Sequence, residues 1–367
     1  MRKKGKWLFI VPTDKIGGAE YIIKSFSSFI IENGGSCRVI VLTRKKWLGW
    51  DELENRIQIS YMPFSKYFLG VFSLIFFLFF KNYSDIEYSF SSQTIINGTL
   101  GFAKRIGLLK GKLVLRESNS IFHLLKGNKL KIYSFFYKMG YIESSLIVTQ
   151  TGFMKSQLID SNPILFNKLN IKTIPNPFDF KDIEVRSGCI CAKFNNIRFF
   201  VAAGRLIPAK GFDILIDAFC KMTEHIEDIH LIILGEGRER RKLTEMAKEL
   251  NMANRIHFPG YVDNVYSYFN KAEVCVISSR IEGFPNVLLQ MMSQNSKVVA
   301  TRSAGGIDDI PGVYTCSPES IIELKNSMLK AVKTKSIFNR DIFNSYLSLR
   351  SMGDFYNKLM EGIEKPS

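Results

Sequence analysis

Histidine and cysteine are scarce in this chain of 367 residues, which argues against a dedicated metal site. There are four histidines and six cysteines. The closest cysteine pair, Cys189 and Cys191, has the wrong spacing for a zinc knuckle or a thioredoxin-like motif. We therefore expect no metal, and we interpret the cysteines as reduced residues of a cytosolic protein.

Long apolar runs are missing as well. The longest, YFLGVFSLIFFLFF at 67–80, has 14 residues, whereas a membrane-spanning helix needs about 20. The first interpretation of this segment is a core helix. The alternative is a segment that inserts partly into a membrane interface, which the flanking Lys66 and Lys81 favour. The basic start MRKKGKWLFIVP has too short an apolar run for a secretory signal, and we expect none.

Acidic residues are few relative to basic ones, mainly in the first half of the chain. Residues 1–185 contain 26 Lys and Arg against 14 Asp and Glu, a net charge of +12; residues 186–367 contain 24 against 20, a net charge of +4. This asymmetry suggests an anionic partner, such as a membrane surface, a nucleic acid or a phosphorylated substrate. A solubilising surface bias is the alternative.

Short apolar strands alternate with helical segments in both halves, which predicts parallel sheets covered by helices and thus two Rossmann-like domains. The predicted strands are 7–11, 36–43, 112–116 and 145–150 in the first half, and 199–204, 230–235, 255–260, 273–278 and 297–301 in the second. The motif IPNPFDF at 174–180 carries two prolines, and a polar, aperiodic segment follows it. We place the domain boundary near 175–197.

Three glycine-bearing turns follow predicted strands: KIGGAE (15–20), GRLIPAKGF (204–212) and GEGRER (235–240). Glycines in such turns let the backbone approach a ligand, and helix N-termini attract anions. None of these turns matches the dinucleotide or Walker fingerprints. Each alone is an ordinary turn, but all of them open at the carboxyl edge of a sheet. Arg205 and Lys210 add two cations suited to a diphosphate, although solvated surface cations are the alternative.

The motif EGFPNVLLQ at 282–290 follows a predicted strand and begins a helix near Asn286. Backbone N–H groups at a helix start point into the space before it. Glu282 lies just before this turn, where it can accept hydrogen bonds from sugar hydroxyls. Gln290 can accept one hydrogen bond and donate another, but it lacks the two-oxygen grip of a carboxylate on a diol.

In order and spacing, these motifs resemble those of family 4 of the retaining glycosyltransferases, which have the GT-B architecture. The resemblance rests on GGAE, IPNPFD, GRLIPAKGF, LILGEG, FPGYVDN, SSRIEGFPNVLLQMMS and VVATRSAGGIDDI. It implies an α/β fold of two Rossmann-like domains that face each other across a cleft, with a C-terminal helix, 354–364, that crosses back to the first. We expect a Rossmann-like acceptor domain at 1–180, a nucleotide-sugar-binding domain at 181–345 and the returning helix within 346–367.

The resemblance also implies roles for individual residues. Glu282 stands at the first glutamate of the family's E-x7-E motif and faces the donor sugar, while Arg205 and Lys210 match its diphosphate-binding cations. Gln290 stands where the family usually has a second glutamate that binds the ribose, and we expect Gln290→Glu to keep or improve activity. The remaining implied donor contacts are Gly17, Gly18, Gly235, Glu236, Gly283, Phe284, Pro285, Asn286 and Val287.

In the first domain, many relatives have a histidine after the strand represented here by KLVLR, where this chain reads LVLRESNS. Arg116, Glu117 and Asn119 are the nearest candidates for a contact with donor or acceptor. The Asp308-Asp309 pair lies beyond the site turn, and we interpret it as surface rather than as a metal site.

The implied activity is transfer of a sugar, with retention of anomeric configuration, from a nucleotide-sugar, by general resemblance a UDP-sugar, to an acceptor hydroxyl. No cofactor or metal is expected. The basic first half and the 67–80 segment suggest an anionic membrane surface as partner. We expect a polyprenyl-diphosphate-linked glycan of a bacterial surface polysaccharide as acceptor, at the cytoplasmic face of the membrane. Three rivals stay open: a GT-B-type nucleotide-sugar epimerase, a basic nucleic-acid-binding protein and a non-catalytic sugar-nucleotide sensor, which Gln290 leaves open.

Overall fold

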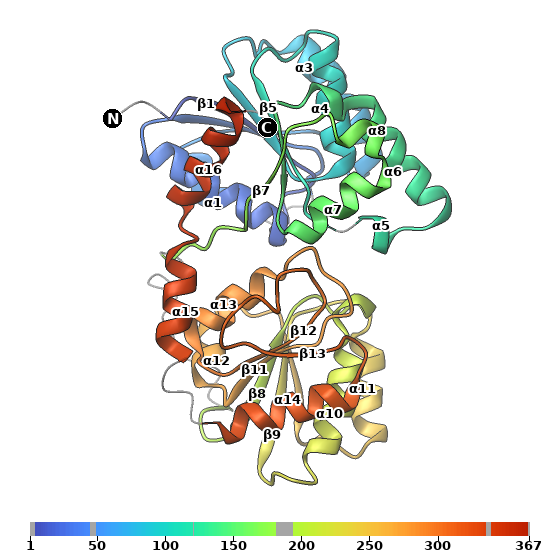
Figure 1. The fold of residues 1–367 in the computed structure, drawn as a ribbon, viewed down its shortest axis with the longest axis vertical. Coiled ribbons are helices and arrows are strands. Elements are labelled where there is room, and N and C mark those ends of the chain that lie inside the picture. The colour runs from blue at the N-terminus through green and yellow to red at the C-terminus, as the bar shows by residue number, and fades with distance from the viewer. Residues whose placement is uncertain (1–3, 45–48, 120, 181–193, 335–338, 366–367) are drawn as a thin grey trace. The chain divides into compact units, whose positions relative to one another are not determined.

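A computed structural model gives the structure of residues 4–44, 49–119, 121–180, 194–334 and 339–365. The chain forms two compact units (Figure 1). Unit 1 comprises Met1–Pro177 together with Met352–Ser367, and unit 2 comprises Phe178–Ser351.

Unit 1 is built on a seven-stranded sheet with the order β3-β2-β1-β4-β5-β6-β7, in which all paired strands are parallel. The strands are β1 Lys6–Val11, β2 Ser36–Val41, β3 Gln58–Tyr61, β4 Tyr88–Ser91, β5 Lys112–Arg116, β6 Leu146–Thr149 and β7 Ile171–Thr173. Because neighbours on both faces cover the interior strand β1, its sequence is apolar at every position after Lys6. Trp7 and Phe9 enter the core on one face, and Leu8 and Ile10 the core on the other.

Helices cover both faces of this sheet (Figure 1). They are α1 Gly18–Glu32, α2 Asp51–Glu54, α3 Tyr67–Phe80, α4 Thr94–Arg105, α5 Ile121–Leu124, α6 Gly127–Gly140, the 3-10 turn η1 Tyr141–Glu143, α7 Gly152–Ser161, α8 Pro163–Phe166 and α16 Met352–Glu364. The C-terminal helix α16 lies beside α1, and the rings of Phe26 and Phe355 meet edge to face with centroids 5.5 Å apart. Asn170 Nδ2 also donates to the Gly362 carbonyl at 2.7 Å.

Unit 2 repeats the plan with a six-stranded sheet of order β10-β9-β8-β11-β12-β13, again parallel. Its strands are β8 Arg198–Ala203, β9 Ile229–Leu234, β10 Ile256–Gly260, β11 Val274–Ile277, β12 Val298–Thr301 and β13 Tyr314–Cys316. Its helices are the 3-10 turn η3 Pro208–Lys210, α10 Phe212–Met222, α11 Arg240–Glu249, α12 Tyr266–Lys271, α13 Asn286–Gln294, α14 Ile321–Lys333 and α15 Asn339–Ser348. Separate apolar cores lie on the two faces of the sheet.

In both sheets the strand order reverses at the first strand. The chain adds the next two strands on one side of it and then crosses to add the remaining strands on the other side. In unit 1 this switch point lies between β1 and β4, and in unit 2 between β8 and β11. Ligands of open α/β sheets bind outside the carboxyl ends of the strands at such a point. The fold therefore directs attention to the loops that follow β8 and β11.

The strands and helices expected from the sequence are present, with small shifts at their ends. The domain limits differ from those expected: unit 2 begins at Phe178 and ends at Ser351. It includes α15 because Phe343 and Leu347 are buried in its core. The linker expected around 175–197 falls largely on 181–193, outside the described residues. Four cysteines are free thiols, at 37, 220, 275 and 316, while Cys189 and Cys191 lie outside the described residues.

The segment 67–80 forms helix α3, as expected, but only half of it is core. Val71, Leu74 and Leu78 are buried, whereas Phe72 is 74% exposed and Phe80 is 79% exposed. The core interpretation is therefore wrong for one side of the helix.

Candidate active site

Two loops meet at the switch point of unit 2. Residues 204–211 follow β8, and residues 278–285 follow β11. Ser278 Oγ donates to the Lys210 carbonyl at 2.9 Å, and the Arg280 N–H donates to the Ala209 carbonyl at 2.8 Å. These hydrogen bonds join the two motifs into one layer at the carboxyl edge of the sheet.

Gly211 makes this close approach possible. Its φ is +62°, in the left-handed region, and a Cβ placed on it would lie 2.1 Å from the Ser278 carbonyl oxygen. Any side chain here would push the two loops apart. The last glycine of GRLIPAKG is therefore required for the geometry of the edge itself.

Lys210 and Glu282 form an ion pair across the two loops, from Lys210 Nζ to Glu282 Oε1. The Ser279 hydroxyl donates to the same carboxylate oxygen at 2.7 Å. The side chains of Lys210 and Glu282 are 18% and 16% exposed, so both are largely shielded yet still reach solvent. The arrangement places a cation and a hydrogen-bond-accepting anion together at the switch point.

Arg280 is a residue of this site that the sequence analysis missed. Its guanidinium binds both carboxylate oxygens of Asp213, at 2.9 and 2.8 Å, and donates to the Pro208 carbonyl at 2.7 Å. It also reaches Glu319 at 2.9 Å. Hydrogen bonds from Arg280 are the main reason that the pKa of Asp213 is lowered. Arg280 thus fixes the β11 loop to the start of α10.

The end of β12 supports the Glu282 loop from the other side. The Glu282 N–H donates to the Ser303 carbonyl at 2.7 Å, and Thr301 Oγ1 donates to the Ser279 carbonyl at 2.6 Å. These bonds hold the backbone on both sides of the loop, so the direction of the Glu282 side chain is set by β12 as well as by its own strand.

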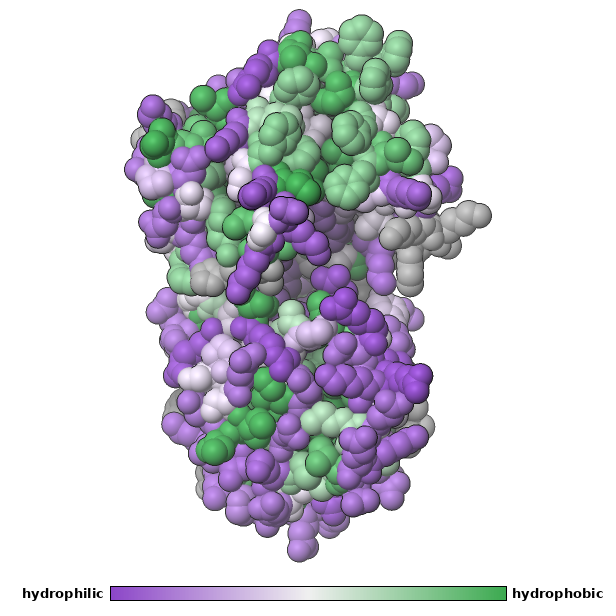
Figure 2. Space-filling view, turned by 90° about the vertical axis from the view of Figure 1, so that its right-hand side faces the viewer, coloured by the Kyte–Doolittle hydropathy of each residue, from purple (hydrophilic) through white to green (hydrophobic). Residues whose placement is uncertain are grey.

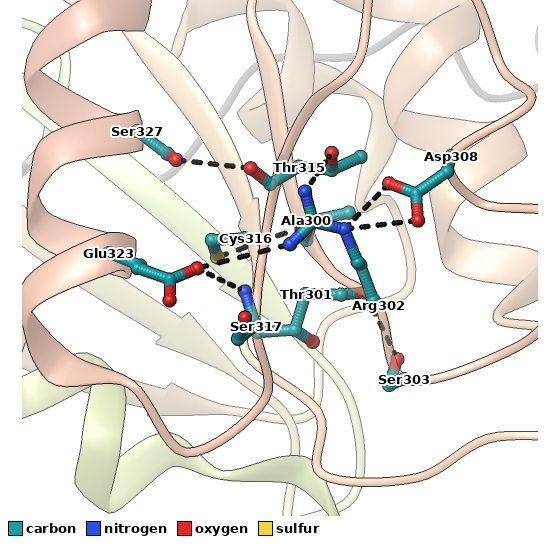
Figure 3. A network of polar contacts seen from close by, with 10 residues as sticks. All are labelled: Ala300, Thr301, Arg302, Ser303, Asp308, Thr315, Cys316, Ser317, Glu323 and Ser327. Atoms are coloured by element: carbon teal, nitrogen blue, oxygen red, sulfur yellow. Dashed lines mark hydrogen bonds and ion pairs between the residues drawn. The ribbon is translucent and has the colours of Figure 1, made fainter.

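A polar network anchors this part of β12 in turn (Figure 3). Arg302 Nε donates to both carboxylate oxygens of Asp308, at 2.8 and 3.0 Å, and its Nη2 reaches the Thr315 hydroxyl at 3.3 Å. The Ser317 N–H donates to Glu323 at 2.8 Å. Asp308 is exposed, as expected for a surface residue.

The turn 283–287 is mostly buried. Gly283, Phe284 and Pro285 are enclosed, and α13 begins at Asn286, with Val287 in its first turn; both of these residues are partly exposed. The Phe284 ring packs in the core, and the Arg350 guanidinium lies 5.5 Å from its centroid. Phe284 and Pro285 therefore hold the start of α13 in place, and a ligand would meet the backbone rather than these side chains.

Gln290 lies one turn into α13 and is partly exposed. Its Nε2 donates to the Tyr266 hydroxyl at 3.4 Å, a long hydrogen bond that leaves the amide oxygen for another contact. Tyr266, at the start of α12, is thus a hydrogen-bond partner of Gln290, the residue that stands in place of the expected glutamate.

The other unit 2 candidates lie on the neighbouring loops. Arg205 is exposed. Gly235 has a φ of +125°, and a Cβ on it would lie 2.1 Å from the Gly204 carbonyl oxygen, so it keeps the β8 and β9 loops close. Glu236 is exposed and pairs with Arg240, while its carbonyl accepts from the Leu206 N–H at 2.9 Å. The Glu236 carboxylate is therefore engaged by Arg240.

In unit 1, Gly17 and Gly18 lie exposed at the start of α1, after β1. The Gly17 N–H donates to the side chain of Glu20 at 3.2 Å. The KIGGAE motif predicts these glycines in the turn between the first strand and the first helix, and they lie there, at the switch point of the first sheet.

Arg116 and Glu117 are placed differently from expectation. Both are buried, with exposures of 1% and 3%. Arg116 donates to the Ser92 hydroxyl at 2.9 Å and to Asn176 Oδ1 at 2.5 Å. Because β5 ends inside the unit, Arg116 binds to the IPNPFD motif through Asn176 and contributes to packing instead of meeting a ligand directly.

The Glu117 carboxylate accepts four hydrogen bonds from buried groups. The donors are the hydroxyls of Tyr137, Tyr141 and Thr94 and the amide of Asn97. Burial raises the pKa of Glu117, and these donors oppose the shift. With its oxygens so engaged, Glu117 is also corrected to an internal role. Of the three candidates Asn119 alone is exposed, with its amide 3.5 Å from the Ser118 hydroxyl.

Among the residues that the structure describes, no group of three or more His, Cys, Asp or Glu side chains is arranged to hold a metal ion. Across the same residues, no helix combines the length and the apolar character that crossing a membrane requires.

Comparison with known proteins identifies the domain that carries this edge. Residues 198–333 match the family model described as "Glycosyl transferases group 1". This part of the chain is similar to a glycosyltransferase group 1 domain. The match covers β8 to α14 and therefore includes Arg205, Lys210, Glu282 and Gln290. The prediction of a glycosyltransferase is confirmed at the level of this domain.

Two curated relatives agree. An uncharacterised glycosyltransferase of Methanocaldococcus jannaschii is 30% identical over 201 residues, which are 53% of this chain and 48% of that protein. The N-acetylgalactosamine-N,N'-diacetylbacillosaminyl-diphospho-undecaprenol 4-alpha-N-acetylgalactosaminyltransferase of Campylobacter jejuni is 26% identical over 234 residues, which are 61% of this chain and 60% of that protein. The matched parts thus span about half of these relatives' lengths.

The solved structures extend the similarity to the whole fold. HepE of Anabaena, crystallised with UDP and glucose, superposes with a TM-score of 0.78 at 17% identity, over 98% of this chain and 100% of that one. The prediction of an α/β fold with two Rossmann-like halves of the GT-B type is confirmed.

Proposed function

We propose that the protein is a retaining glycosyltransferase of family 4 that moves a sugar from a nucleotide-sugar, a UDP-sugar, to a lipid-linked glycan. The observation that carries the proposal is the Lys210–Glu282 pair at the switch point of the unit 2 sheet. UDP is the favoured donor nucleotide because the structural relative HepE was crystallised with it. A lipid-linked acceptor is favoured because the Campylobacter jejuni relative is named for an undecaprenol-linked substrate.

The chemistry requires stabilisation of the leaving diphosphate. As the bond between the anomeric carbon and the phosphate oxygen breaks, its electrons pass to the diphosphate, whose negative charge grows. Lys210 and the exposed Arg205 supply positive charge, and the backbone at the start of α13 adds N–H groups. Removing one such donor raises the barrier by about 2.7–4 kcal/mol in well-studied enzymes.

Glu282 positions the donor sugar by accepting hydrogen bonds from its hydroxyls. The acceptor hydroxyl attacks the anomeric carbon on the face that the diphosphate leaves, and its proton passes to a phosphate oxygen, so the configuration is retained. This route needs no second carboxylate as nucleophile. It also needs no metal, because side-chain cations and amides neutralise the diphosphate.

Donor binding requires an exchange of partners at Lys210. In the structure its ammonium is held by Glu282. A diphosphate that enters the site competes for this ammonium, and the sugar hydroxyls then donate to the released Glu282 oxygen. The same pair thus keeps both groups oriented before the donor arrives.

The place of reaction is the cytoplasmic face of the membrane, with growth of a bacterial surface polysaccharide as the setting. A lipid-linked acceptor and the net charge of +12 over residues 1–185 both favour an anionic leaflet. Gly17, Gly18 and Asn119 of unit 1, which are exposed, are the unit 1 groups proposed to contact a substrate.

The test is a transfer assay with purified protein. A panel of UDP- and GDP-sugars is first screened by thermal shift, and the best donor is incubated with undecaprenyl-diphosphate-linked acceptors. Saturating donor at about 100 times its dissociation constant stabilises the fold by about 2.7 kcal/mol. We expect a product whose new linkage has the anomeric configuration of the donor by NMR. Inversion contradicts the retaining mechanism, and conversion of the donor without any acceptor favours the epimerase.

A further inference from the structure

Helix α3 of unit 1 exposes a continuous apolar stripe. Exposures of its outward side chains run from 50% to 79%, and the residues are Phe68, Leu69, Phe72, Phe76, Phe79 and Phe80. Their spacing of three and four residues places them on one side of the helix. Val71, Leu74 and Leu78 form the opposite, buried side. The helix has no charged residue from Tyr67 to Phe80, so its solvent side is as apolar as its core side.

Helix α6, which packs against the same helix α4 as α3 does, also exposes apolar side chains. Ile132 is 46% exposed and Phe135 is 60% exposed. Both α3 and α6 pack against α4, and the three helices share one apolar core. Figure 2 shows apolar side chains gathered over this end of unit 1. We call the exposed apolar residues of α3 and α6 the α3–α6 face.

Within the two segments that form this face, the charge has one sign. Lys66 and Lys81 stand at the two ends of α3, and α6 contributes exposed lysines at 126, 129, 131 and 138. The segments 66–81 and 126–140 contain no acidic residue. Among the described residues, none of these six lysines has an ion pair. The face is therefore apolar at its centre and cationic at its margins.

This combination fits an anionic lipid surface. Phenylalanine and leucine side chains enter the boundary between headgroups and acyl chains, while lysines remain at the level of the headgroups. At 1.5 Å per residue the 14 residues of α3 extend about 21 Å, too short to cross a hydrocarbon core of about 30 Å. A second copy of the chain would instead bring like-charged lysines together, which opposes dimerisation through this face.

We infer that the α3–α6 face docks unit 1 on an anionic bilayer, with α3 lying in the plane of the interface and its phenylalanine stripe inserted. The inference deepens the proposed function, because it names the surface that brings the enzyme to a lipid-linked acceptor. Only this purpose of docking rests on the proposed function. Vesicle binding can be measured independently of catalysis.

The test uses the full-length protein in co-sedimentation with vesicles of phosphatidylcholine, alone or mixed with phosphatidylglycerol. We expect binding to the mixed vesicles that weakens with added salt. The double variant Phe72→Ser/Phe76→Ser should weaken it about tenfold or more, because both side chains are largely exposed and their loss removes inserted area. The matched control is Ile322→Ser, a 64% exposed apolar residue of α14 in unit 2, which should bind as the wild type does. Lys129→Glu/Lys131→Glu should weaken binding and flatten its salt dependence.

Three outcomes would overturn the inference: wild-type protein that stays in the supernatant with both vesicle types, equal binding by the Phe72→Ser/Phe76→Ser variant, or a dimer in lipid-free buffer that this variant dissociates. Circular-dichroism melting checks that each variant is folded. Transfer to a water-soluble acceptor analogue should be unchanged in the Phe72→Ser/Phe76→Ser variant. If the protein binds vesicles but transfers no sugar from any donor, the proposed function fails and the docking inference stands.

Discussion

Lys210 and Glu282, 72 positions apart in the chain, form an ion pair at the switch point of the unit 2 sheet, between β8 and β11. Neither β8 nor β11 alone could create this arrangement. It depends on Gly211, whose missing side chain lets the two loops touch, and on Arg280, which holds them together. The pair supplies the two functions that donor binding needs, a cation for the diphosphate and a carboxylate for the sugar.

Replacement of Glu282 should separate nucleotide binding from transfer. In Glu282→Gln the amide no longer competes with a diphosphate for Lys210, so affinity for UDP should stay equal or rise. Transfer should fall by about a hundredfold, because the sugar loses an anionic acceptor of its hydroxyl hydrogens. Titration calorimetry with UDP and a transfer assay give the two numbers. Parallel loss of both would show that Glu282 has only a structural role.

Gln290→Glu should keep or improve activity. A carboxylate at this place can bind both hydroxyls of a ribose, and it can accept from the Tyr266 hydroxyl, to which the Gln290 amide now donates. The measurement is KM for the nucleotide-sugar, which should be equal or lower. A drop in kcat/KM of more than about tenfold in a folded protein would count against the ribose role.

Arg280→Ala should destabilise unit 2 by about 1–3 kcal/mol, because charge-assisted hydrogen bonds to Asp213 and to a backbone carbonyl are lost. Transfer should decrease further, since the Lys210 and Glu282 loops lose their connection. Urea unfolding measures the first effect. The matched control is Arg241→Ala, whose i,i+4 pair with Glu245 is exposed and whose loss should leave the free energy of unfolding almost unchanged. Equal effects of the two substitutions would contradict the role of Arg280 in holding the two loops together.

The histidine pair of unit 2 predicts a loss of stability in mild acid. His230 Nδ1 lies 3.0 Å from His257 Nε2, and burial, with a contribution from Arg255, lowers the pKa of His230 below its usual 6.5. The unfolded chain therefore takes up a proton before the folded chain does. The stability that neutral His230 contributes to the folded state is fully present above about pH 6.5. It is lost as the pH falls through the pKa of His230 in the folded chain.

Urea unfolding at about pH 7.5 and about pH 5 measures this loss. Wild type should lose more free energy of unfolding over that interval than His230→Gln does. His225→Gln, at an exposed position of the same unit, is the control and should follow the wild type. A pH dependence that persists unchanged in His230→Gln would show that other groups cause it.

The sequence predicted the elements that bury long apolar runs, and the physical reason is direct. Strands such as β1, β8 and β11 are covered on both faces, so their residues are apolar apart from the first residue of β1 and of β8. The strands not predicted, such as β3 with QISY and β7 with IKT, are three or four residues long and carry polar residues. The paired loops of the site could be anticipated because parallel strands open their βα turns at one edge.

Other features depend on contacts that no local pattern contains. Arg280 gains its meaning from Asp213, 67 residues away. Arg116 and Glu117 follow a strand as a ligand contact would, but the buried hydroxyls of α4 and α6 enclose Glu117. In α3 both sides are apolar, so periodicity could not decide which side faces the core.

Titration of UDP into the Lys210→Met variant tests the central claim most directly. If Lys210 binds the diphosphate at the switch point, wild-type protein should bind UDP, and the variant should bind it about tenfold or more weakly, as expected for loss of a charge-assisted contact. Lys242→Met, which removes an exposed lysine of α11 in the same unit, should bind UDP like the wild type. Equal affinity for UDP in the wild type and both variants would place the nucleotide elsewhere and contradict the account.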